Sequence, residues 1–454
     1  MEIQEIEKKP MENVWRIPFL QIVWSFILTT ITINFYGLQY ILPAVGVMLL
    51  LIGVHSLKQI NQNFYSLCYL AIERAVLFII NLLILSTPLS LHKSVIGCLS
   101  ILSLILQIAM YLVLRTSIRT VYGDHANKVK RDPLLWASRL MVVTGFVSWM
   151  SYDLGVLFAL LFFIIFLTIM SSLYKISEEL YTIAPDASVE SNKKFDKIVY
   201  VIFTLICFLS VGVAGVVSNH TVVEFVEQTE LKEHAMREEL IQLGFPKEIL
   251  YDMSDANVEL LTGAIHVEVR EDVMSFDEKT SLISSTVFTE LPDNLMYVVV
   301  YFQWNQNKAI WNDGFRIWGE DGFTLIDGNL LCEQKGKDVI APINRLSCGT
   351  VTTSSMFFGE QQSRQITGTI CFPFHSKHQR GYVFYKMQLP EDYWLGSNCM
   401  NYVHFSQPIQ LPFAYADQRI LSGTCEVKQH YVIFYLQQYR ESYPDSDDWK
   451  MPWD

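Results

Sequence analysis

Residues 196–221 read DKIVYVIFTLICFLSVGVAGVVSNHT, and this stretch decides how the chain is organised. Within it, Ile198 to Val217 is an uncharged apolar run of about the 20 residues that a helix needs to cross a bilayer. Hydrophobic stretches joined by short basic loops make up almost all of the chain before this run. The chain after it is acidic and rich in turn residues. The run therefore predicts the boundary between a membrane block, residues 1–217, and a water-soluble part.

Charge is divided unevenly between these two parts. The chain has 454 residues and a net charge of −12. From Ser218 onward there are 33 acidic and 18 basic side chains, a net charge of −15, whereas the first 217 residues hold 13 and 16, a net charge of +3. An acidic domain argues against a nucleic-acid partner, because binding to phosphates needs a basic surface.

Seven membrane-spanning helices are predicted from the apolar runs, at 17–33, 38–54, 67–86, 95–114, two within 140–172, and 198–217. One helix over 140–172 would be about 50 Å long, against about 30 Å for the hydrocarbon core. The loops on either side of it are basic, which predicts a cytoplasmic position for both and hence two crossings that turn at Asp153.

The orientation follows from the same rule. Residues 1–12 are polar, carry Lys8 and Lys9 and lack a cleavage pattern, so we expect a retained signal anchor with a cytoplasmic N-terminus. Seven crossings then place the C-terminal domain outside the cell membrane, as its acidic charge also favours.

Residues 218–263 are expected to form a helical linker and residues 264–440 an antiparallel β-sandwich of jelly-roll type. Ser254 can cap a short helix, and Gly263 can end the helical part. From Ala264 the hydrophobic period changes to two, and Asp313-Gly314, Asp321-Gly322 and Asp327-Gly328 are typical hairpin turns. Residues 441–454 are expected to be an acidic tail.

Polar residues inside the apolar runs are the first candidate site. Glu73 and Arg74 lie in the third run and Gln107 in the fourth, and ionisable groups in a bilayer often mark a transport pathway. The competing interpretation, which we favour, is that Arg74 extends toward the cytoplasmic face and Glu73 meets a polar partner such as Gln107.

Aromatic side chains of the β region are the second candidate. Trp304, Trp311, Trp318 and Trp394 could form a binding face for a sugar or peptide, or they could belong to the core, which we favour.

Chemical motifs point to no further site. His375 and His378 have metal-like spacing but do not complete a zinc site, and no G-x-S-x-G, H-E-x-x-H or Walker loop is present. We therefore assign no catalytic, cofactor-binding or metal-binding residue. The soluble part holds five cysteines (Cys332, Cys348, Cys371, Cys399 and Cys425), and the sequence leaves open whether any of them pair.

Three short sequence segments resemble segments of known proteins: INFYGLQYILP at 33–43, LGFPKEIL at 243–250 and RGYVFY at 380–385. They resemble uncharacterised multi-pass membrane proteins of Gram-positive bacteria that have a C-terminal β-rich domain, over most of the chain. The resemblance implies the same layout and no activity.

Two functions fit these features. The first is a non-enzymatic membrane protein that displays an extracytoplasmic β domain to bind or sense a ligand or partner protein. The alternative is a transporter, or an accessory subunit of one, that uses Glu73. A polar cavity that reaches Glu73 would favour the transporter.

Overall fold

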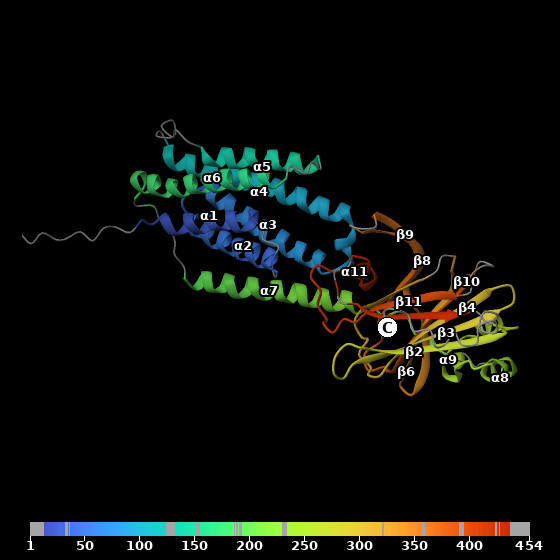
Figure 1. Cartoon of the computed structure of the whole chain (residues 1–454). Helices are drawn as coiled ribbons and strands as arrows, with labels where there is room; N and C mark the ends of the chain where they lie inside the picture. The colour runs from blue at the N-terminus through green and yellow to red at the C-terminus, as the bar shows by residue number, and fades with distance from the viewer. Residues whose placement is uncertain are drawn as a thin grey trace, which may run out of the picture. The chain divides into compact units, whose positions relative to one another are not determined.

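In the computed structural model, the described residues of the first part of the chain form seven α-helices (Figure 1). They are α1 (Arg16–Thr30), α2 (Leu38–Leu57), α3 (Gln62–Leu85), α4 (Lys93–Tyr122), α5 (Pro133–Trp149), α6 (Gly155–Ile183) and α7 (Lys193–Asn219), with a short 3-10 helix at Pro88–Leu91. The structure describes residues 13–31, 35, 37–123, 132–150, 155–185, 187, 189, 193–228, 234–319, 322–355, 359–389, 395–422, 425 and 427–435. The chain divides into two units after Ala214.

Five of these helices are long and apolar enough to cross a membrane: α2, α3, α4, residues Leu157–Ile183 of α6, and α7. Helix α1 and the apolar part of α5 (Pro133–Val147) are shorter. The 15 residues of α1 extend only about 22 Å, less than the hydrocarbon core of about 30 Å. Five candidate spans are thus established, and the count of seven stays a prediction. The division of 140–172 into two helices is confirmed, while the turn at Asp153 lies outside the described residues.

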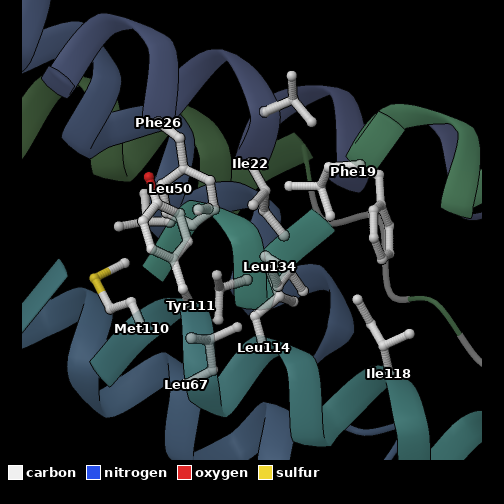
Figure 2. Packing of buried hydrophobic residues seen from close by; sticks show 14 of the residues in the cluster. Phe19, Ile22, Phe26, Leu50, Leu67, Met110, Tyr111, Leu114, Ile118 and Leu134 are labelled. Atoms are coloured by element: carbon white, nitrogen blue, oxygen red, sulfur yellow. The ribbon is translucent and has the colours of Figure 1, made fainter. Parts of the chain in front are cut away.

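A continuous apolar core holds helices α1 to α6 together. Figure 2 shows Phe19, Ile22 and Phe26 of α1 facing residues of α4 and α5, with Leu50 and Leu67 from α2 and α3 in the same cluster. The rings of Phe26 and Tyr111 meet edge to face at 4.7 Å. Each helix is apolar around most of its circumference, so the inward side chains form the core and the others remain exposed on the surface of the unit.

Glycines bring α1 and α2 into close contact. A Cβ at Gly53 would lie 2.9 Å from the carbonyl oxygen of Pro18, and one at Gly46 would lie 2.8 Å from Cγ2 of Thr29. Small residues allow close approach of backbones, which is the main source of packing between membrane helices.

The described strands of the second unit form two antiparallel sheets. The seven-stranded sheet has the order β1-β7-β6-β10-β4-β3-β2, and the five-stranded sheet has the order β12-β11-β5-β9-β8. The strands are β1 (Val226–Glu227), β2 (His266–Ser275), β3 (Ser281–Leu291), β4 (Leu295–Trp304), β5 (Asp313–Gly319), β6 (Thr324–Gln334), β7 (Lys337–Pro342), β8 (Asn344–Ser355), β9 (Gly359–Ile370), β10 (Lys377–Gln388), β11 (Leu395–Val403) and β12 (Lys428–Tyr435). The predicted antiparallel two-sheet class is confirmed, and the jelly-roll connectivity stays a prediction.

The run 296–302 is apolar throughout because both faces of its strand are covered. Val298, Val300 and Phe302 of β4 point into the core between the two sheets. The alternate residues Tyr297, Val299 and Tyr301 pack under a layer of short helices. These helices are α8 (His234–Gln242), α9 (Lys247–Asp252) and α10 (Asp255–Glu259), so part of the segment expected as a linker covers the outer face of the sheet.

Local signals for these helices agree with the structure. The Ser254 side chain accepts a hydrogen bond from the amide of Asn257 at the start of α10, as predicted. Gly244 and Gly263 have positive φ angles of 100° and 82°, which glycine adopts without strain.

The turns predicted at Asp313-Gly314 and Asp327-Gly328 are wrong, because both pairs lie inside strands, β5 and β6. Glycine is required at these two positions because a larger residue would collide with a neighbouring side chain. A Cβ at Gly314 would collide with the side chain of Ala416, which begins the last helix, α11 (Ala416–Ser422). One at Gly328 would lie 2.6 Å from Cδ2 of Leu346.

Candidate functional site

A groove of about 910 Å³ opens where α8 and α9 meet the outer face of the seven-stranded sheet. Its walls come from α8, α9, the segment around β1, and strands β4, β6, β7 and β10. The lining residues are mostly charged: Glu227, Gln228, His234, Glu248, Tyr251, Asp252, Tyr301, Gln303, Glu333, Lys337, Asp338, His378 and Arg380. Antiparallel pairing puts Arg380 of β10 opposite Gln303 of β4, which brings polar side chains from separate strands to one place.

A buried ion pair forms part of the groove lining. Asp252 is only 6% exposed, and its two carboxylate oxygens accept hydrogen bonds from Nε and Nη2 of Arg380 at 2.7 and 2.9 Å. The hydroxyl of Tyr301 donates to the same carboxylate at 3.0 Å. Burial lowers the pKa of Arg380, but the bonds and charge of Asp252 outweigh it and raise that pKa. Burial and the Asp252 charge both raise the pKa of Tyr301, so its hydroxyl keeps its proton. Two bonds from one guanidinium to the two oxygens of one carboxylate form a bidentate ion pair, which is a strong form of ion pair.

Acidic groups outnumber the basic groups around this ion pair. Lys337 contacts both carboxylate oxygens of Glu227 at 3.0 Å, and the side chain of His378 lies 3.6 Å from Glu333. Asp338 lies 3.5 Å from Arg380. In all, five carboxylates line the groove with one arginine and one lysine, both of which contact carboxylates. The groove therefore favours positively charged ligands.

Sequence-predicted polar residues of the membrane unit lie on different faces of their helices. Glu73 is exposed on α3, and among the described residues it makes no hydrogen bond or ion pair. Arg74 is half-buried and donates from Nη1 to the Ser103 side chain and, at 3.4 Å, to the Ser103 carbonyl on α4. Gln107 is buried on α4. The structure thus brings Arg74 to α4 and does not join Glu73 to Gln107.

The predicted tryptophans do not share one face within the described residues. Trp304 is 3% exposed and packs against Phe276 and Tyr402, which confirms the core interpretation for this residue. Trp311 is half-buried and meets Phe374 edge to face at 5.7 Å. Trp318 is half-buried on β5, 5.7 Å from the guanidinium of Arg316. Trp394 lies outside the described residues.

Most groove residues were missed by sequence reasoning because they come from distant segments. Asp252 and Arg380 are 128 positions apart, and nothing in their local sequence pairs them. One signal was available: the phrase RGYVFY places Arg380 and Tyr382 on alternate positions of a strand, hence on one face. His378, considered for metal binding, lines the groove instead, and no cluster of metal-ligating side chains occurs in the described part of the chain.

These features define a protein with apolar helices that could cross a membrane, followed by a two-sheet β unit with a charged groove. No family model matches the chain, and no curated protein matches it.

Similarity to solved structures covers about two fifths of the chain. The collagen-binding domain from a Staphylococcus aureus adhesin is 10% identical, with a TM-score of 0.19, over 38% of this chain and 99% of that one. AvmM, which catalyses macrocyclization in alchivemycin A biosynthesis, is 10% identical, with a TM-score of 0.18, over 37% and 89%. The collagen adhesin from S. aureus is 12% identical, with a TM-score of 0.17, over 40% and 70%.

Proposed function

We propose that this chain is a multi-pass membrane protein that displays its C-terminal β unit outside the cytoplasm and binds a positively charged ligand there without chemical conversion. The groove described above is the observation that carries the proposal. Its volume of about 910 Å³ is within the range of ligand-binding clefts, which is about 300–1,000 Å³.

The ligand class follows from the balance of charge. Arg380 is neutralised by Asp252, and Lys337 by Glu227, so neither cation offers strong attraction to an anion. Glu248, Glu333 and Asp338 add three carboxylates. A basic peptide segment is the ligand that matches an open, acidic groove.

Binding of labelled hexalysine to the full-length protein in detergent micelles tests this proposal, with hexaglutamate as the opposite-charge probe. We expect saturable binding of hexalysine that weakens with added salt, and no binding of hexaglutamate. Glu248→Gln and Glu333→Gln together should weaken hexalysine binding about tenfold, which corresponds to about 1.4 kcal/mol. Glu278→Gln is the matched control, because Glu278 is exposed outside the groove. Equal binding of both probes, or equal loss in the control, would contradict the proposal.

Transport is the second candidate function, and Glu73 is the residue that suggested it. The side chain is exposed on α3, beside the exposed Tyr69, Ile72 and Val76, whereas the core residues of that helix are Phe64, Leu67, Ala71 and Leu77. Glu73 therefore does not face the interior where a pathway between these helices would run. Its position supports the binding function over the transporter.

A further inference from the structure

A second cavity, of about 420 Å³, is formed mainly by the loop after β11. It is lined by His404, Phe405, Ser406, Gln407, Ile409, Gln410, Leu411 and, from α11, Arg419. None of these residues belongs to the acidic groove. The cavity is therefore a separate site with its own chemistry.

The loop that forms this cavity is attached to the end of α7. The side chain of Asn219, the last residue of α7, donates to the Gln407 carbonyl at 3.0 Å and accepts from Gln410 at 3.0 Å. One turn earlier, Gly215 packs on Ile409, since a Cβ there would lie 3.0 Å from Cγ2 of that side chain. The loop that forms the cavity wall is therefore hydrogen-bonded to the end of α7 and packed against it.

With α7 as the last membrane span proposed above, this attachment would put the cavity at the level of the lipid headgroups. Helix α7 has 27 residues and is about 40 Å long, close to the full thickness of a bilayer with its headgroup regions. Its last residue, Asn219, then lies in the headgroup region. Ile409 is 40% exposed beside it, as suits an apolar side chain at the membrane surface.

Two basic side chains, His404 and Arg419, line the cavity, and His404 is paired with a buried carboxylate. Nδ1 of His404 lies 3.0 Å from Oδ2 of Asp313, a fully buried carboxylate that also accepts bonds from the Tyr402 hydroxyl and the Phe405 amide. Burial lowers the pKa of His404, but the Asp313 charge outweighs it and raises that pKa. Arg419 lies 5.4 Å from the ring of Phe405. No carboxylate is among the described residues that line this cavity.

We propose that the cavity around His404 and Arg419 binds the phosphate group of an anionic lipid headgroup beside the end of α7. An imidazolium and a guanidinium both form charge-assisted hydrogen bonds to phosphate oxygens, and Arg is well suited to phosphate geometry. The β unit as a whole is acidic and is repelled by an anionic surface, so the contact is made by one headgroup in one local pocket. Free phosphate has the same chemistry, and the experiment must separate the two sources.

The ring of Trp304 lies 4.9 Å from that of His404, so its emission responds to the cavity. The chain has ten tryptophans, so the signal is the difference in emission between the protein and its Trp304→Phe variant. The full-length protein in uncharged detergent micelles is titrated with phosphatidylglycerol, phosphatidylcholine or inorganic phosphate. We expect a saturable emission change with phosphatidylglycerol alone. Arg419→Gln should weaken it at least about tenfold, and Arg419→Lys should weaken it less because it keeps the charge. Lys386→Gln, at an exposed lysine of β10, is the matched control and should have no effect.

Each other outcome overturns the proposal. Equal affinity for inorganic phosphate assigns the cavity to free phosphate, and equal response to phosphatidylcholine shows an effect of lipid rather than of charge. An unchanged affinity for phosphatidylglycerol in Arg419→Gln shows that Arg419 does not bind the headgroup. This conclusion requires that the variant unfold in lipid-free micelles at the same midpoint as the original protein.

Discussion

Glu73 and Arg74 show how adjacent residues on a helix acquire different surroundings. Neighbours on an α-helix point about 100° apart, so Arg74 reaches Ser103 of α4 while Glu73 faces outward. Helix α3 begins at Gln62, which places Glu73 about 17 Å along the helix. Glu73 contacts no polar partner among the described residues, and the expected partner Gln107 is buried elsewhere on α4. The sequence shows how far along the helix Glu73 lies. The direction in which Glu73 points depends on which side of α3 packs against the neighbouring helices.

Replacing Glu73 with leucine is therefore expected to leave the thermal stability of the protein in micelles unchanged or to raise it. The substitution removes an outward-facing carboxylate and breaks no described bond. Arg74→Leu is the matched comparison, and its unfolding midpoint should fall because it leaves the Ser103 side chain without its donor. Equal losses in the two variants would show that Glu73 has a partner. A proton- or ion-dependent defect in Glu73→Gln would support the transporter.

The His404–Asp313 pair predicts a pH dependence of stability. The folded-state pKa of His404 is raised, so its contribution is complete below its unfolded pKa of about 6.5 and is lost as pH rises through the folded value. The nearby charged groups are Asp313, Asp277 and Lys308. The unfolding midpoint, followed by tryptophan fluorescence, should fall over this range, and the fall should be smaller in His404→Gln. Identical profiles for the two proteins would contradict the assignment.

At the scale of elements, the short helices α8 to α10 act as a third layer. They bury the outer face of the seven-stranded sheet, where Tyr297, Val299 and Phe384 would otherwise be exposed. Arg237 of α8 is fully buried and donates to the Met253 carbonyl and to Asp255, which ties these helices together. The segment was expected as a linker because its sequence is charged. Its few apolar residues are nevertheless enough to cover one face of a sheet.

Removing this layer is expected to destabilise the β unit. A fragment of residues 215–454 should be soluble and show β-type circular dichroism, whereas a fragment of residues 264–454 should aggregate because a wide apolar face is uncovered. Gel filtration of the two fragments at equal concentration checks the result. Two monomeric fragments with equal unfolding midpoints would show that the helices contribute nothing to stability.

At the scale of the whole molecule, charge and hydropathy divide at the same place. The division after Ala214 lies three residues before the boundary predicted from the apolar run, and it falls inside α7. A single continuous helix therefore contributes to both units. The carboxylate excess after residue 217 and the basic loops before it are the basis of the proposed orientation.

Thiol labelling of intact cells tests that orientation. In a protein without its native cysteines, one cysteine placed at Lys335 should react with an impermeant reagent, and one placed at Lys193 should react only after the cells are opened. Both lysines are exposed in the structure, so protection at either position reports the membrane and not burial. Labelling at Lys193 but not at Lys335 in intact cells would reverse the orientation.

The sequence by itself determined the two-part layout, the helices, and the change to antiparallel strands after Ala264. These depend on the local period and length of apolar runs, which every short window of sequence displays. Only the tertiary structure decided which side chains meet. The groove joins residues from α8, α9 and five strands, and the pocket at His404 joins a loop to α11. Such contacts depend on strand order and register, and a local sequence pattern does not contain that information.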